Sequence, residues 1–284
     1  MKTFETKTLV DGLVFAEGPR WHDNKLWFSD MFGGKVHTVD LEGNLETIVE
    51  VEHPSGLGWL PDGRLIIVGM KDRALFAFDK GVLSTYCDLS EICQGVPNDM
   101  VIDAQGRAYV GNIGCDLFAG EEPKPAELVL VENGVARVVV PAPGMVFPNG
   151  TVITPDGKTL IIAESWANRL TAFDINPADG SLSGRRIFAD LGERDPDGIC
   201  LDAEGAVWTG TFEKGEFARV LDGGEVTHVI DTGGRRAAAC MTGGPGRNIL
   251  FMISSATTHD DLVRGISSSR IDIAEIDVSG AGLP

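Results

Sequence analysis

Residues 148–164, PNGTVITPDGKTLIIAE, contain the pattern from which the fold prediction follows. A Pro-Asn-Gly motif leads into an apolar run, a Pro-Asp-Gly turn follows, and a second β-prone run ends at Glu164. Two short apolar runs joined by a glycine-containing turn predict an antiparallel hairpin. The same plan recurs along the chain, and its motif position falls on six residues: Glu17, Ser55, Asn98, Asn149, Asp197 and Ala239.

The repeat is 38 to 51 residues long. A third β-prone run follows in each unit, as at residues 169–173, and a fourth often comes after it, as at residues 45–49. Four short strands in about 44 residues are typical of a β-propeller blade. The sequence therefore predicts an all-β fold in which residues 1–284 form one six-bladed β-propeller domain, with four antiparallel strands in each blade.

We expect the N-terminal strand to close the ring. Residues 3–10 and residues 270–278 both have strand-like patterns, and pairing them in the last blade would remove exposed sheet edges. The alternative is a two-domain β protein, but no Pro- or Ser-rich linker divides the chain. No segment shows a sustained helical period, so we expect little helix.

The composition limits the classes of partner. The 24 basic residues face 42 acidic ones, which gives a formal net charge of −18. This acidity disfavours nucleic acid, because binding to phosphates needs clustered Lys and Arg, and it disfavours anionic membrane surfaces. No apolar run approaches the roughly 20 residues of a transmembrane helix. The sequence predicts neither a nucleic-acid nor a membrane partner, and it leaves the oligomeric state open.

We expect a cytoplasmic protein. The N-terminal residues contain no apolar segment of the kind that a signal peptide needs. The five cysteines form no Cys-X-X-Cys pair, and their odd number favours reduced thiols.

Stacking the repeats predicts a ring of oxygen donors. The innermost strand of each blade lines the central channel, so equivalent positions share one height. Glu17, Asn98, Asn149 and Asp197 offer carboxylate or amide oxygens, which a hard divalent cation such as Ca²⁺ requires. Without a cation, carboxylates confined in a channel would repel each other. The alternative is that Asn149-Gly150 and Asp197-Gly198 are ordinary hairpin turns.

A second layer of positions is expected at the ends of the neighbouring strands. Their side chains either orient the first layer or touch substrate, or else they only form hydrogen bonds between strand ends. Of this layer, Asn112 is the residue that we expect to contact substrate. The layer comprises Asp30, Gly69, Asn112, Glu164, Thr211 and Ser254.

Other residues near the ring have two interpretations each. Asp99 is either an acid/base group or a turn cap. Phe147 and Trp166 either form the wall of an apolar substrate pocket or pack between blades. Residues 114–125 form a surface loop that is a candidate lid. His259 either reaches the channel mouth or is solvated.

The motifs Glu17-Gly18-Pro19, Asn98-Asp99, Pro148-Asn149-Gly150 and Pro196-Asp197-Gly198, in this order, resemble those of the senescence marker protein/gluconolactonase family, the regucalcin-like lactonases. The likeness extends over roughly residues 12–255. It implies a six-bladed propeller with one divalent cation on its axis.

The resemblance also implies roles for individual residues. The cation ligands fall on Glu17, Asn149 and Asp197. Asn98 would contact substrate or the surroundings of the cation, and Asp99 would be an acid/base group. Sugar-lactone members carry an arginine at the position of Val96 and an acidic residue near Cys115. These two apolar replacements predict a lactone or ester that is less polar than a sugar lactone.

We therefore expect a metal-dependent hydrolase of small-molecule lactones or related esters. Asp99, Asp197 and Glu17 are the expected catalytic residues, and the expected substrate contacts are Asn98, Asn112, Trp166 and Phe147. Ca²⁺ is the expected cation, while Zn²⁺, Mn²⁺, Mg²⁺ and Fe²⁺ suit the same oxygen ligands. The alternatives are a phosphotriesterase-like hydrolase resembling diisopropyl fluorophosphatase and a non-catalytic ligand-binding propeller. No GxSxG or HExxH motif occurs, so serine-hydrolase and His-ligated zinc chemistry lack their motifs.

Overall fold

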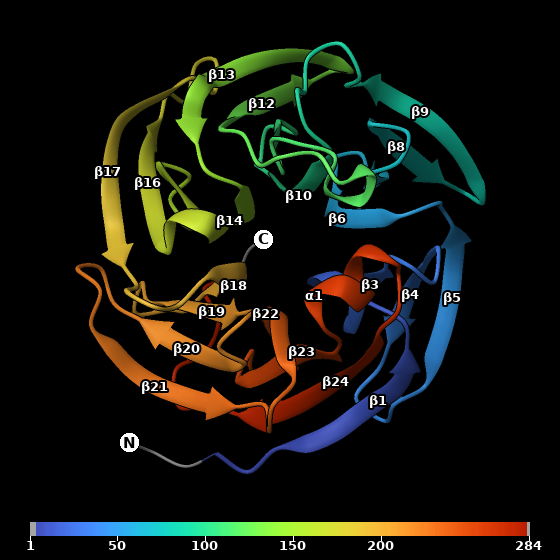
Figure 1. Ribbon diagram of the computed structural model, residues 1–284, viewed down its shortest axis with the longest axis vertical. Coiled ribbons are helices and arrows are strands. Elements are labelled where there is room, and N and C mark those ends of the chain that lie inside the picture. The colour runs from blue at the N-terminus through green and yellow to red at the C-terminus, as the bar shows by residue number, and fades with distance from the viewer. Residues whose placement is uncertain (1–3, 283–284) are drawn as a thin grey trace.

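The computed structural model describes residues 4–282 and consists of six four-stranded sheets arranged in a ring (Figure 1). The sheets follow one another in chain order, so each sheet is one blade. Within the first five blades, the strand that carries the motif lies nearest the axis, and the next three strands follow outward. The predicted all-β, six-bladed propeller is confirmed.

The strand boundaries are as follows. Blades one and two contain β2 (Ala16–His22), β3 (Lys25–Asp30), β4 (Lys35–Val39), β5 (Leu45–Glu50), β6 (Pro54–Trp59), β7 (Leu65–Gly69), β8 (Ala74–Asp79) and β9 (Val82–Asp88). Blades three and four contain β10 (Pro97–Ile102), β11 (Ala108–Asn112), β12 (Ala126–Glu132), β13 (Val135–Met145), β14 (Pro148–Ile153), β15 (Thr159–Glu164), β16 (Arg169–Ile175) and β17 (Leu182–Asp190). Blades five and six contain β18 (Pro196–Leu201), β19 (Val207–Thr211), β20 (Glu216–Val220), β21 (Val226–Asp231), β22 (Arg236–Gly243), β23 (Ile249–Ala256), β24 (Ser268–Glu275) and β1 (Lys7–Leu13).

Helix is confined, within residues 4–282, to the short segments η1 (Leu117–Ala119), η2 (Ser165–Ala167) and α1 (His259–Val263). Each segment follows the second strand of its blade, so all three lie at the end of the ring where the inner strands begin. This low helix content agrees with the absence of a helical period in the sequence. No helix in this part of the chain has the length and apolar character needed to span a membrane.

The N-terminal strand closes the ring as predicted. β1 pairs antiparallel with β24, with Lys7 opposite Ile273 and Leu13 opposite Ser269, and Figure 1 shows the two strands side by side at the outer edge. The predicted segment begins at residue 3, which lies outside the described residues. At its other end, β24 stops at Glu275, before the predicted end at residue 278. The last blade is thus completed by the first strand of the chain.

The inner strands pack closely where their motifs lie. A Cβ atom on Gly198 of β18 would lie 2.3 Å from the Cβ of Ala239 in β22. A Cβ atom on Gly150 of β14 would lie 2.5 Å from the carbonyl oxygen of Asp197. Side chains essentially never approach at these distances, so the glycine that follows the motif residue lets one blade touch the next. The preceding side chains are thereby held around a narrow axis.

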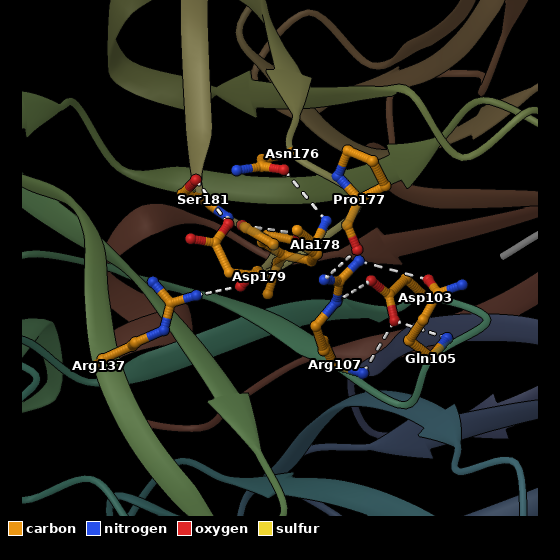
Figure 2. Close-up of polar contacts among 11 residues, drawn as sticks. Asp103, Gln105, Arg107, Arg137, Asn176, Pro177, Ala178, Asp179 and Ser181 are labelled. Atoms are coloured by element: carbon orange, nitrogen blue, oxygen red, sulfur yellow. Dashed lines mark hydrogen bonds and ion pairs between the residues drawn. The ribbon is translucent and has the colours of Figure 1, made fainter.

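Polar contacts join neighbouring blades at their rims, and Figure 2 shows those between blades three and four. In the turn between β10 and β11, Arg107 Nε donates to Asp103 Oδ2 (2.6 Å) and Arg107 Nη1 donates to the carbonyl oxygen of Pro177 (3.2 Å). Arg137 of β13 donates to the carbonyl oxygen of Asp179. Because Pro177 and Asp179 lie between β16 and β17, these contacts hold that turn of blade four against blade three.

Ring closure by β1 predicts an unequal response of two leucines in outer strands. Leu13 of β1 is 6% exposed, whereas Leu45 of β5 is 44% exposed. Leu13→Ala should lower the free energy of unfolding by about 2–4 kcal/mol, because it removes a buried side chain and leaves a cavity. Leu45→Ala should lower it by less than about 1 kcal/mol. Urea denaturation measures both, and equally small effects would show that β1 contributes nothing to the closed ring.

Candidate active site

The candidate site lies on the axis, at the end of the ring where the inner strands begin. Glu17, Asn98, Asn149 and Asp197 are each the second residue of an inner strand, in β2, β10, β14 and β18 respectively. In each strand the pairing register shifts at this point, and an irregularity of this kind re-aims the side chains. All four side chains line one cavity, and we call them the axial residues.

Three of the axial residues, Asn98, Asn149 and Asp197, are linked by a chain of hydrogen bonds. Ser55 Oγ donates to Asn98 Oδ1 (2.9 Å), and Asn98 Nδ2 donates to Asn149 Oδ1 (3.0 Å). Asn149 Nδ2 donates to Asp197 Oδ1 (2.5 Å) and to Ser165 Oγ (3.1 Å). Asn149 and Asp197 lie inside strands, so their interpretation as hairpin turns is wrong. The structure therefore brings together the four residues that the repeat pattern placed at one height.

The two axial carboxyl groups line the same cavity, where Asp197 is buried and Glu17 is half-buried. Burial raises the pKa of Glu17 to about 8. Burial also raises the pKa of Asp197 well above its usual value, and the negative charges of Glu17, Asp195 and Asp99 raise it further. No Lys or Arg side chain of the described chain lines this cavity. The site thus concentrates carboxyl groups whose charge no Lys or Arg of the cavity lining neutralises.

The donors available to a metal ion are two carboxylates and two amides. Residues 4–282 contain no group of three or more His, Cys, Asp and Glu side chains arranged to hold a metal ion. A cation at the axial residues would therefore need amide oxygens among its ligands. Carboxylate and amide oxygens together are an accepted ligand set for Ca²⁺.

Asp99 occupies the position directly after the motif residue of blade three. The same position holds glycine in blades one, two, four and five. The Oδ1 atom of Asp99 accepts hydrogen bonds from Arg20 Nη2 (2.7 Å) and from the Met100 backbone N–H (2.8 Å). The two side chains of the ion pair are 5% (Arg20) and 10% (Asp99) exposed. The carboxylate passes over Gly56 of β6, where a Cβ would lie 2.7 Å from Asp99 Oδ1. Because Asp99 lies inside β10, it does not cap a turn, and it ties β10 to β2.

The second-layer side chains hold loops. Asp30 Oδ1 accepts a hydrogen bond from the Phe15 backbone N–H (2.7 Å), just before β2. Glu164 Oε2 accepts one from the Val146 backbone N–H (2.9 Å), just before β14. Each carboxylate thereby fixes the chain two or three residues ahead of an axial residue. Both residues thus form hydrogen bonds near the ends of strands. Through these bonds they also orient the axial residues.

Asn112 has a comparable structural role. It is fully buried and does not line the cavity among the residues that the structure describes. Its Nδ2 atom donates to the carbonyl oxygen of Glu127 (3.0 Å), and its Oδ1 atom accepts from the Gly114 backbone N–H (2.9 Å). The structure therefore places Asn112 in support of the loop that follows β11, and not beside the other expected substrate contacts.

The side chains one residue beyond the second layer form a further ring, which the repeat analysis did not recognise as a layer although it suggested Phe212 for the wall of an apolar pocket. Met31, Met70, Ile113, Ser165 and Phe212 each follow the second strand of their blade, and all five line the cavity. Four of the five are apolar. The signal was present in the sequence, because these residues hold equivalent repeat positions, but the strand pattern did not show which of two adjacent residues faces the axis.

The cavity has a volume of about 330 Å³. Phe147 and Trp166, two expected substrate contacts, lie on its wall, with ring centroids 4.7 Å apart and planes at 63°. Phe15 and Phe212 also lie on the wall, with ring centroids 6.3 Å apart. The axial residues therefore form a polar floor beneath a largely apolar wall.

Two segments cover the mouth of the cavity. The candidate lid, residues 114–125, contributes Leu117 and Phe118 from η1. Helix α1, which the sequence did not predict, contributes His259 and Leu262. Figure 1 shows α1 on the inner side of the ring, next to β23. His259 thus reaches the channel mouth.

Val96 and Cys115 do not line the cavity, although both suggested an apolar substrate. Val96 is 6% exposed and Cys115 is fully buried. The Val96 N–H donates to the Cys115 carbonyl oxygen (3.3 Å), and the Ile113 N–H donates to the Val96 carbonyl oxygen (2.9 Å). The two residues lie behind Ile113, so the apolar character of the wall comes from other side chains.

The model of the SMP-30/gluconolactonase/LRE-like region matches residues 15–256. The chain belongs to the SMP-30/gluconolactonase family. Pentonolactonase XacC of Haloferax volcanii is 24% identical and matches 98% of this chain and 96% of its own length. A luciferin-regenerating enzyme has the same fold, with a TM-score of 0.83 and 15% identity over 99% of both chains. Regucalcin of Agrobacterium tumefaciens, described as a calcium-binding protein, has a TM-score of 0.78 and 22% identity over 97% of this chain and 96% of its own.

In this gluconolactonase-family chain, the motifs that carried the resemblance are the ones that meet on the axis. Glu17-Gly18-Pro19 comes from blade one, and the other three motifs come from blades three, four and five. Blade six contributes no oxygen-bearing side chain at this height, because Ala239 holds its slot. The donor set is therefore asymmetric around the ring.

Glu17→Gln tests the charge of the site separately from its shape. A carboxyl group whose pKa is higher in the folded than in the unfolded state contributes stability that is full below the unfolded pKa of about 4.5 and is lost as pH rises toward 8. Glu17→Gln removes this loss. In chelator-treated protein, the Tm of Glu17→Gln minus that of the wild type should therefore increase from about pH 4.5 to about pH 8.

The matched control is Glu50→Gln at the exposed end of β5, which should give a difference in Tm that stays level with pH. A level difference for Glu17→Gln as well would contradict the raised pKa of this group.

Proposed function

We propose that this protein is a lactonase-type hydrolase that opens a lactone, or a related carboxylic ester, at one divalent cation on the propeller axis. The observation that carries the proposal is the pair Glu17 and Asp197, whose carboxyl groups share one cavity with the amides of Asn98 and Asn149 and with no Lys or Arg of the described chain. Membership of the family and the similarity to a pentonolactonase support the reaction class. The calcium-binding regucalcin supports a cation at this site.

Glu17, Asn149 and Asp197 are the residues that would hold the cation. Two carboxylates and a neutral amide carry a charge of −2, which matches a divalent ion. Asn149 now directs its Nδ2 atom at Asp197, and a half-turn of the amide exchanges its nitrogen and oxygen. The hydrogen-bond chain through Asn98 can reverse with it, because the Ser55 hydroxyl either donates or accepts. We favour Ca²⁺, and Mg²⁺, Mn²⁺, Zn²⁺ and Fe²⁺ are the other candidates.

The reaction divides between the cation and the chain. A bound divalent cation supplies Lewis-acid polarisation of the carbonyl group and stabilises the developing oxyanion. Asn98 lies at the cavity floor, where its amide can orient the substrate. Water adds to the carbonyl carbon, the ester C–O bond breaks, and the proton lost by the water passes through a carboxylate to the leaving alkoxide oxygen.

We assign the proton transfer to Asp99, which follows Asn98 in β10 and lies behind the residues that line the cavity. Glu17 and Asp197 are the axial carboxylates that could take this role instead. Arg20 and the Met100 N–H fix Asp99 Oδ1. Asp99 Oδ2 makes no hydrogen bond to another residue of the described chain, so it remains available to accept a proton. The ion pair with Arg20 would hold the carboxylate in one orientation during the reaction.

The wall of the cavity favours a substrate with an apolar or aromatic portion. Met31, Met70, Ile113, Phe147 and Phe212 would surround the part of the substrate that extends from the carbonyl group. Hydroxyl groups of a sugar lactone that lie against these apolar side chains would lose water without gaining partners, at about 1–3 kcal/mol each. We therefore propose an alkyl or aryl lactone or ester as the preferred substrate class.

Asp197→Ala should lose bound cation and activity together. Elemental analysis should find one divalent ion per chain in the wild type and none in the variant, and kcat/KM for an aryl lactone should fall by more than about 100-fold. Asp79→Ala, at the exposed end of β8, serves as the control. Full activity of metal-free Asp197→Ala would contradict the proposal.

Two outcomes of the same assays would favour the other function classes. Cleavage of a phosphotriester without cleavage of any lactone or ester would favour the phosphotriesterase-like alternative. Cation binding without any hydrolysis would favour a ligand-binding propeller.

The substrate class predicts a ratio of specificity constants. The value of kcat/KM for an aryl lactone should exceed that for gluconolactone, because only the aryl lactone makes extensive contact with the apolar side chains of the cavity. Phe118→Ala should lower kcat/KM for the aryl lactone by about ten-fold, since it removes apolar contact area, and it should leave kcat/KM for gluconolactone nearly unchanged. A wild-type ratio well below one would contradict this substrate class and leave the cation site unaffected.

A further inference from the structure

A second cavity of about 310 Å³ lies at the opposite end of the ring. The inner strands begin at the candidate active site, and this cavity is lined where they end: at Arg20 and His22 of β2, at Trp59 of β6 and beyond Ile102 of β10. Arg247, from the turn between β22 and β23, completes the polar part of the lining. The two cavities share no lining residue.

Arg247 is a cation without a carboxylate partner. Its side chain makes no hydrogen bond or ion pair with residues 4–282, and it is half-buried. Partial burial lowers the pKa of Arg247, because the charged guanidinium loses water. In a chain with 42 acidic and 24 basic residues, a half-buried arginine that faces no carboxylate of residues 4–282 leaves a position open for an external anion.

Arg20 also lines this cavity, but its hydrogen bonds are internal. Its side chain is 95% buried, since its exposed fraction is 5%. Nη1 and Nη2 donate to the Pro19 carbonyl oxygen and to Asp99. Nε has no partner in the described chain and is not exposed to the cavity, so Arg247 is the guanidinium that a ligand can reach.

The rest of the cavity wall includes flat aromatic rings and one carboxylate whose charge is neutralised by a neighbouring arginine. The His22 ring stacks on Trp59, with centroids 4.0 Å apart and planes at 12°, and Trp27 packs edge-on against Trp59. Asp103 is the one carboxylate of the described lining, and its charge is taken up by Arg107, at 2.6 Å. A ligand would therefore meet one free guanidinium and rigid ring faces.

We propose that this distal cavity binds a small monocarboxylate with a flat, apolar body. A guanidinium binds a carboxylate through two parallel hydrogen bonds. One unpaired arginine neutralises a single negative charge, and the net charge of the protein, −18, opposes a doubly charged anion such as phosphate. The ring faces of Trp59 and His22 accommodate the apolar body. The proposal does not depend on the proposed hydrolase activity.

Titration calorimetry of the full chain with benzoate tests the proposal. Benzoate should bind saturably, and Arg247→Gln should weaken it by at least about ten-fold, because a charge-assisted hydrogen bond is lost. Arg247→Lys should weaken it less, because the charge remains. Benzamide, the neutral isostere, should bind at least about ten-fold more weakly than benzoate.

Two controls locate the site. Arg264→Gln, at the exposed end of α1, should leave the affinity for benzoate unchanged, and so should Asp197→Ala in the other cavity. The Tm of each variant without ligand shows that it is folded. Absence of saturable binding, equal affinity in Arg247→Gln, or loss of binding in Asp197→Ala would each overturn the proposal.

Discussion

Closure of the ring forces two acidic side chains, Glu17 of blade one and Asp197 of blade five, into one buried space on the axis. Burial raises the pKa of both groups, and the charge of Glu17 raises that of Asp197 further, so the arrangement opposes its own ionisation. The fold tolerates this because the surrounding constraints are strong: β1 completes the last blade, and the motif glycines let the inner strands touch. A bound cation would convert the repulsion into coordination, and this is the physical basis of the proposed hydrolysis.

The repeat pattern predicted the six blades, the closing strand and the meeting of the four axial residues. These features depend on turn residues and on strand periodicity, which are local and recur in each unit. The pattern could not show which of two adjacent residues at the end of a strand faces the axis. Thus Asn112 supports a loop, while Ile113 beside it lines the cavity. The helix α1, only five residues long, leaves no periodic signal at all.

Contacts between distant blades were also beyond the sequence. Asp99 stood out as an exception among the motif glycines, but its ion pair with Arg20 crosses from β10 to β2 over β6, and no local pattern encodes such a pairing. The apolar substrate was inferred from Val96 and Cys115, which the structure places behind the wall. The apolar wall that supports this class of substrate is formed by Met31, Met70 and their equivalents, so this expectation rests on different residues from those that suggested it.

The central claim is that one divalent cation binds between Glu17, Asn149 and Asp197, and anomalous diffraction from crystals grown with Mn²⁺ tests it most directly. The account predicts one strong anomalous peak on the axis, with oxygen atoms of all three side chains within about 2.0–2.6 Å. It also predicts that the Asn149 amide has turned its oxygen toward the peak. The account would be contradicted if crystals of fully active protein showed no anomalous peak on the axis, or showed the peak away from these three residues.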